Sequence, residues 1–87
     1  MHTVSIGVLN ETNVHPREVY KIAILSNAAS IIVGHNHPAG TLTPSKADIE
    51  TTKHLQEAGA LLGIKLLDHI IVTDSNFYSL AEGGYIY

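Results

Sequence analysis

The chain has 87 residues, a length that allows one domain with a modest core. Hydrophobic residues make up 45% of it and charged residues 15%, which excludes the composition of a disordered chain. The formal net charge of −3, with five Lys and Arg residues, argues against nucleic-acid binding, and the lack of cysteine excludes disulfides and thiolate metal sites.

The sequence also bears on the cellular compartment and on partners. Met1–Ser5 lacks the basic start and the long apolar core of a signal peptide, and no run reaches the length of a membrane span. We therefore expect a cytoplasmic protein with no membrane partner, in keeping with its lack of disulfides. A homo-oligomer stays open, because an exposed edge strand near the aromatic Tyr85–Tyr87 tail would offer an interface.

The first third of the chain predicts a strand, a helix and a second strand. Thr3–Leu9 alternates apolar residues with small or polar ones, as in a strand with one buried face. Pro16 suits the first turn of a helix that ends near Asn27, and Ser30–Gly34 has the apolar, β-branched character of a central strand. Because the first strand starts close to Met1, we expect residues 1–87 to form one domain that is N-terminally incomplete.

A loop and a long helix follow. Residues 38–44 contain two prolines and a glycine, as loops do. Ser45 and Asp48 have the spacing of a capping box, in which a serine at the N-cap and an acidic residue three positions later satisfy free backbone amides. The helix should continue to about Leu62 and stop at Gly63.

The last third predicts two strands. Ile64–Thr73 is apolar except for Asp68 and His69, and Phe77–Leu80 follows a short turn. The order β-α-β-α-β-β predicts an α/β (α+β) domain in which helices pack on a mixed sheet.

Asp68 and His69 interrupt an apolar strand, so one of them must face a buried side. A buried charge is costly unless it is paired. This pair could orient a histidine ligand of a metal site, or it could form a structural hydrogen bond between a strand and a loop. We favour the structural interpretation.

The stretch that follows the second predicted strand carries the strongest functional signal. His35 and His37 are two positions apart, so in an extended chain both imidazoles lie on one face. Asp48 in the first turn of the next helix would point its carboxylate toward the same place. Two histidines, a carboxylate and a position for water are the usual components of a catalytic zinc site. The alternative is a surface turn followed by an ordinary capping box.

The residues from His35 to Asp48 follow the pattern H-x-H-P-x-G-x-x-x-P-S-x-x-D. This pattern resembles the JAMM motif of the JAB/MPN metalloprotease superfamily. More closely, the chain resembles the MPN domain of bacterial RadC-like proteins, once called DNA repair proteins. The resemblance runs from about Ser5 to the C-terminus and includes the phrases Val14–Val19 and Leu67–Val72.

The resemblance implies an MPN/JAB-like (cytidine-deaminase-like) fold with a three-layer arrangement around a mixed sheet. It implies that His35, His37 and Asp48 bind Zn²⁺ and that Ser45 helps to hold the oxyanion of the tetrahedral intermediate. The implied reaction is hydrolysis of a peptide, isopeptide or related amide bond in a peptide or protein substrate. Relative to RadC-like proteins, Ala39 replaces a serine, and the N-terminal helix-hairpin-helix region and leading strands are absent.

An upstream glutamate acts as the general base in JAMM proteins. Glu18 is our candidate, because it lies in the matching His-Pro-Arg-Glu phrase ahead of the predicted metal-binding strand. Glu11 is a weaker candidate, and a glutamate outside this chain is a further alternative. Acidic residues also favour first helical turns because of the helix dipole alone, without any catalytic role.

Two other functions compete with the hydrolase. A non-catalytic MPN interaction module would retain the metal site and lack turnover, as expected if the general base is missing. A DNA-repair accessory protein is suggested by the older family name, but the acidic charge balance opposes it for this segment.

Overall fold

The structure is a computed structural model that describes residues 4–9, 16–37 and 42–86. Its elements in chain order are β1 (Val4–Leu9), α1 (Pro16–Leu25), β2 (Ser30–Asn36), α2 (Lys46–Leu62), β3 (Lys65–Val72) and β4 (Phe77–Ser79). This order confirms the predicted β-α-β-α-β-β sequence of elements. No helix among the described residues is long and apolar enough to cross a membrane.

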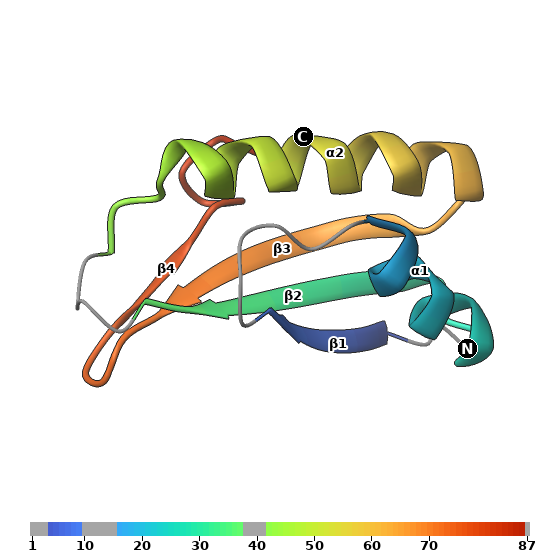
Figure 1. The fold of residues 1–87 in the computed structure, drawn as a ribbon, viewed down its shortest axis with the longest axis horizontal. Helices are drawn as coiled ribbons and strands as arrows, with labels where there is room; N and C mark the ends of the chain where they lie inside the picture. Colours follow the sequence, from blue (N-terminus) through green and yellow to red (C-terminus); the bar gives the residue numbers. More distant parts are fainter. Residues whose placement is uncertain (1–3, 10–15, 38–41, 87) are drawn as a thin grey trace.

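The strands form one mixed sheet in the order β1-β2-β3-β4 (Figure 1). β1 pairs with β2 and β2 pairs with β3 in parallel, whereas β4 runs antiparallel to β3. Parallel neighbours need a crossover connection, and α1 and α2 supply the two crossovers. The α/β class and the mixed sheet are therefore confirmed.

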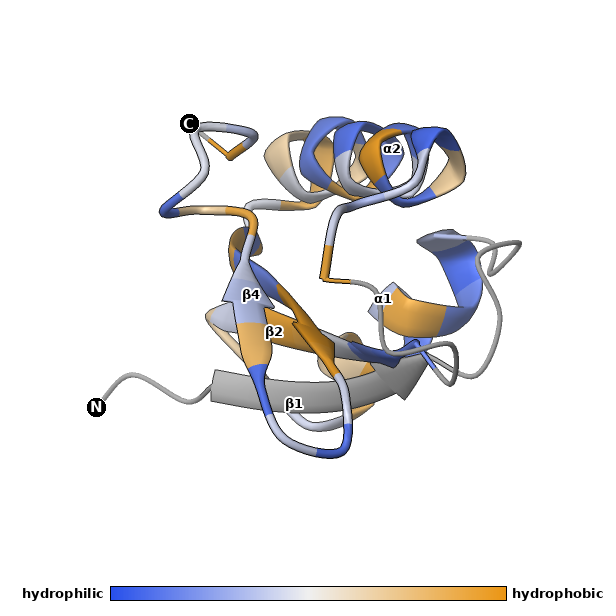
Figure 2. Cartoon of the chain, turned by 90° about the vertical axis from the view of Figure 1, so that its left-hand side faces the viewer, coloured by the Kyte–Doolittle hydropathy of each residue, from blue (hydrophilic) through white to orange (hydrophobic). Residues whose placement is uncertain are grey.

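Both helices cover the same face of the sheet (Figure 2). They contact each other directly, and the buried Tyr20 hydroxyl of α1 donates a hydrogen bond of 2.7 Å to the carbonyl oxygen of Leu55 in α2. On the opposite face, the side chains of Leu67 and Val72 are 37% and 42% exposed. Among the described residues, the helices thus form one layer against the mixed sheet, in agreement with the predicted α/β fold class. Two crossovers of the same hand that advance in one direction along a sheet place both helices on one face.

The hydrophobic core lies between the helices and the sheet. Its buried members come from α1, β2, α2, β3 and the connections between them: Tyr20, Ala23, Ala28, Ile31, Val33, Leu55, Ile64 and Leu66. Burial raises the pKa of the Tyr20 hydroxyl to about 12, so this group stays protonated and keeps its hydrogen bond to α2.

The helix ends agree with the sequence predictions. α1 finishes at Leu25, and Asn27 adopts a left-handed backbone conformation (φ 53°) that turns the chain toward β2. α2 starts after Ser45 with a complete capping box and ends at Gly63, whose φ of 72° is the usual left-handed stop.

β2 extends two residues beyond the predicted strand and includes His35. His35 pairs with Ile71 across the sheet. The β2–β3 register shifts between Ile31 and Ile32, so that Ile31 lies opposite Leu66 whereas Ile32 lies opposite Asp68. This bulge leaves one residue of β3 without a partner and changes which side chains beyond it face the helices.

Candidate metal centre

Asp48 is the central residue of the site. The α2 capping box places it, because the Ser45 backbone N–H donates to the Asp48 Oδ2 atom at 2.8 Å while the Asp48 N–H donates to the Ser45 Oγ atom at 3.0 Å. The side chain is completely buried, at the end of α2 that lies beside the carboxyl end of β2. A carboxylate held in this way has little freedom to move, which suits a metal ligand.

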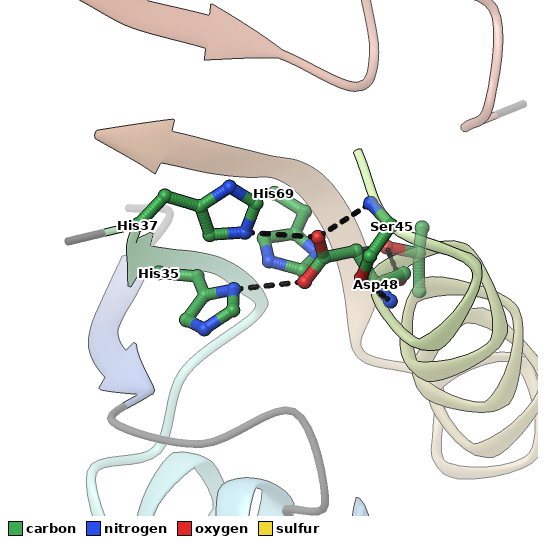
Figure 3. Close-up of polar contacts among 6 residues, drawn as sticks. His35, His37, Ser45, Asp48 and His69 are labelled. Carbon is green, nitrogen blue, oxygen red and sulfur yellow. Dashed lines mark hydrogen bonds and ion pairs between the residues drawn. The ribbon is translucent and has the colours of Figure 1, made fainter. Parts of the chain in front are cut away.

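His35 and His37 both reach this carboxylate (Figure 3). The His35 Nδ1 atom lies 2.8 Å from Asp48 Oδ1, and the His37 Nε2 atom lies 3.0 Å from Asp48 Oδ2. The centroids of the two imidazole rings are 4.7 Å apart, with the rings nearly perpendicular. The structure therefore brings together the three residues that the motif selects, and their role as ligands stays a prediction.

His69 of β3 joins the same cluster. Its side chain is 1% exposed, and its Nδ1 atom lies 2.7 Å from the Thr52 Oγ1 atom of α2. His35, Asp48 and His69 each offer a potential ligand atom, and these atoms lie within 4.8 Å of one another. Figure 3 shows the His69 ring behind the Asp48 carboxylate. The sequence signal for His69 was an imidazole within an apolar strand, for which we favoured a structural interpretation.

Asp68, the neighbour of His69, faces the other side of the sheet and makes structural hydrogen bonds. Its carboxylate accepts from the Ser79 hydroxyl at 2.6 Å and from the Ala81 backbone N–H at 3.1 Å. It also accepts from the His69 backbone N–H at 2.7 Å. The predicted strand-to-loop hydrogen bond is therefore confirmed for Asp68, which connects β3 to β4 and to the turn that follows.

The electrostatics of the cluster favour an anionic Asp48. Burial by itself would raise the pKa of this carboxyl, but hydrogen bonding with the Ser45 backbone and side chain and the charges of His35 and His37 outweigh it, and the pKa is lowered. Burial lowers the pKa of His69 to about 4, against the opposing charge of Asp48. At neutral pH the site thus contains a carboxylate beside a neutral His69 imidazole.

Of the remaining predicted residues, Ser45 and Glu18 lie in the part of the chain that the structure describes. Ser45 is exposed, and its hydroxyl serves as the N-cap of α2. Glu18 is exposed in the first turn of α1, and none of the hydrogen bonds recorded among the described residues joins it to the histidines or to Asp48. Glu11 and Ala39 lie outside the described residues. The proposed roles of Ser45 and Glu18 stay predictions.

The donor atoms fit a transition-metal ion. Imidazole nitrogen and carboxylate oxygen are common ligands of zinc, and the buried His69 Nε2 atom has no hydrogen-bond partner within the described part of the chain. Because ligands bind a metal in deprotonated form, an ion placed here would replace the imidazole–carboxylate contacts of the metal-free site.

Comparison with known proteins identifies the family. Residues 1–85 match the RadC-like JAB domain. The chain belongs to the RadC-like JAB domain family. A UPF0758 protein of Staphylococcus carnosus is 58% identical over 82 residues, which cover 94% of this chain and 36% of that protein. A UPF0758 protein of Caldanaerobacter subterraneus is also 58% identical, over 85 residues that cover 98% of this chain and 36% of that protein.

A third relative gives the same result. The UPF0758 protein of Staphylococcus epidermidis is 60% identical over 79 residues, which cover 91% of this chain and 35% of that protein. The chain therefore spans about a third of the length of these curated relatives. Their names state no reaction, so any assignment of chemistry to this RadC-like JAB domain depends on the geometry of the site.

Proposed function

We propose that this domain is a metal-dependent hydrolase of the JAMM type, with His35, His37 and Asp48 holding a zinc ion. The observation that carries the proposal is the convergence of two imidazoles on one buried carboxylate, at 2.8 and 3.0 Å. Zinc bound by these residues would supply a Lewis acid and a water activated at neutral pH. The proposed reaction is hydrolysis of a peptide, isopeptide or related amide bond.

The chain's own residues would contribute orientation and charge. The capping box holds Asp48 in one position, and β2 holds His35 within the sheet, so little side-chain entropy is lost when these ligands bind. Ser45 is exposed next to this carboxylate, where we propose that its hydroxyl donates to the oxygen that gains charge in the transition state.

The general base has two candidates within this chain and one outside it. Glu18 is the stronger of the first two and is exposed in the first turn of α1, whereas Glu11 lies outside the described residues. The alternative is a glutamate in the part of the longer relatives that this chain does not span. The exposure of Glu18 also favours the second candidate function, an interaction module that holds zinc without turnover.

Zinc content tests the metal site. We expect about one zinc per chain for the wild type by plasma mass spectrometry, and loss of that zinc in His37→Ala. The matched control is His54→Ala, because His54 is an exposed histidine on α2 and should leave the zinc content unchanged. A folded wild-type protein without stoichiometric metal would refute the proposed hydrolase.

Peptidase assays then separate hydrolase from interaction module. Zinc-loaded wild type and Glu18→Gln are compared on a peptide library and on isopeptide-linked substrates. Turnover that Glu18→Gln abolishes while the zinc content stays constant supports Glu18 as the base. Turnover that survives this substitution excludes it. Zinc binding without turnover, in this chain and in a full-length relative, favours the interaction module.

A further inference from the structure

We propose that the His69 Nε2 atom is a fourth protein donor to the metal ion, alongside His35, His37 and Asp48. This inference rests on the proposed metal site and does not depend on the reaction catalysed there. The JAMM-like motif that selects the other three residues ends at Asp48, so His69 lies 21 positions beyond it in the sequence.

The position of His69 is the first argument. Its ring comes from β3, on the far side of β2 from β1, and the β2–β3 bulge turns it toward the helices. There it lies 6.2 Å from the His35 ring, measured between centroids, and a ligand atom of His69 is within 4.8 Å of ligand atoms of both His35 and Asp48. A modest movement of side chains would bring these atoms to the separation that a shared ion requires.

The distribution of hydrogen atoms is the second argument. The Thr52 hydroxyl donates its one hydrogen to the Asp48 backbone carbonyl at 2.9 Å. Its 2.7 Å contact with the His69 Nδ1 atom must therefore use a hydrogen carried by that nitrogen. A neutral imidazole has a single N–H, so the lone pair of His69 is on Nε2. Metal-binding histidines commonly donate their second nitrogen to an oxygen in this way.

The lack of a partner for that lone pair is the third argument. The Nε2 atom is fully buried and has no hydrogen-bond partner among the described residues. A buried polar atom without a partner is rare and costly, and it therefore needs an explanation. The nearby Asp48 carboxylate is also electron-rich and would repel the lone pair, unless a cation or an N–H lies between them. A metal ion would satisfy both groups at once.

The proposed set contains three imidazole nitrogens and one carboxylate oxygen. Such a nitrogen-rich set favours zinc, cobalt and other late first-row transition metals over magnesium or calcium, which prefer oxygen ligands. With four protein donors, a water would have to bind as a fifth ligand or replace one of the donors. Thr52 is then a positioning residue, because it fixes the tautomer of His69 without contacting the ion.

The decisive experiment measures metal affinity and coordination in His69→Asn. Asparagine keeps an N–H near the Nδ1 position for Thr52 but has no atom at the Nε2 position. We expect the zinc affinity, measured by competition with a chromogenic chelator, to fall more than about 100-fold, beyond the 10- to 100-fold typical of residues that only orient a ligand. The visible spectrum of the Co²⁺-loaded protein should change as well. Thr52→Val should weaken zinc binding about tenfold, whereas Thr52→Ser should match the wild type.

The outcomes separate this inference from the proposed function. If the wild type binds zinc and His69→Asn loses less than about 100-fold in affinity or keeps the wild-type Co²⁺ spectrum, the inference is overturned and the three-ligand site stands. If the wild type binds no zinc, both the inference about His69 and the proposed metal-dependent function are refuted. Should His69→Asn fail to fold, NMR of the wild type loaded with ¹¹³Cd²⁺ decides: metal coupling to three imidazoles including His69 supports the inference, and coupling to His35 and His37 alone overturns it.

Discussion

Gly59 offers a test in which helix propensity and tertiary packing predict opposite signs. It lies inside α2, where an exposed glycine replaced by alanine would stabilise the helix by about 1 kcal/mol. In the folded domain Gly59 is buried against α1 and the start of β3. We therefore expect Gly59→Ala to destabilise the protein.

The expected magnitude follows from the contacts that a Cβ atom would make. It would overlap the carbonyl oxygen of Ile64, which is backbone, and would lie 2.5 Å from the Tyr20 hydroxyl. Neither group moves freely, because the Ile64 N–H donates to the Gly59 carbonyl at 2.9 Å and Tyr20 donates to Leu55. Overpacking costs about 1–3 kcal/mol and a lost hydrogen bond about 1 kcal/mol. After subtracting the gain in propensity, about 1 kcal/mol, the net loss is about 1–3 kcal/mol.

Urea denaturation of the metal-free protein, followed by circular dichroism, measures this loss as a lower midpoint at unchanged slope. The control is Ala60→Gly, at an exposed position of the same helix, which should cost about 1 kcal/mol from propensity alone. If Gly59→Ala equals or exceeds the wild type in stability, the close approach of α1, α2 and β3 described above is wrong.

Two further predictions concern the site. Ser45→Ala should lower the free energy of unfolding by about 1 kcal/mol through loss of the N-cap, whereas Ser45→Thr should keep most of the stabilisation that the cap provides. If urea titrations show the same loss of stability for both variants, the capping role is excluded. In the metal-free protein, the free energy of unfolding should fall as the pH drops from 6.5 toward 4. In this range His69 is protonated in the unfolded chain but stays neutral in the folded protein, where its pKa is about 4. The ionisable groups whose charges act on this ring are Asp48, His35 and His37 in the cluster and Asp68, which acts from the other side of the sheet. The loss is on the order of 3 kcal/mol at pH 4 and disappears only about one pH unit above 6.5, because half of the unfolded His69 is still protonated at pH 6.5. A profile equally steep in His69→Asn would contradict the assignment of this loss to His69.

The elements and most of the histidine–carboxylate cluster could be predicted because their signals are local. Ser45 and Asp48 form a capping box within one turn of helix, and Gly63 ends that helix through its own backbone freedom. The i, i+2 spacing of His35 and His37 sets both imidazoles on one side of an extended chain, and both contact Asp48. In each case the information is contained in a few consecutive residues.

The place of His69 depends on a feature that no local pattern reveals. Side chains alternate along a strand, so whether Asp68 or His69 faces the helices depends on the register between β2 and β3. The bulge opposite Ile31 and Ile32 turns His69 inward and Asp68 outward. Without it, Asp68 would face the helices and His69 would leave the cluster, because a shift of one residue exchanges the two faces.

The sheet face that each helix covers is likewise a property of the assembled chain. The sequence predicted the helices and the mixed sheet, and the direction in which successive crossovers advance then places α1 and α2 on one face. Local periodicity shows that a helix has an apolar side but not which sheet face it covers. The composition, caps and histidine spacing thus specify the parts of this domain, whereas pairing register and crossover direction bring distant residues such as Asp48 and His69 together, because these depend on contacts between segments far apart in the chain.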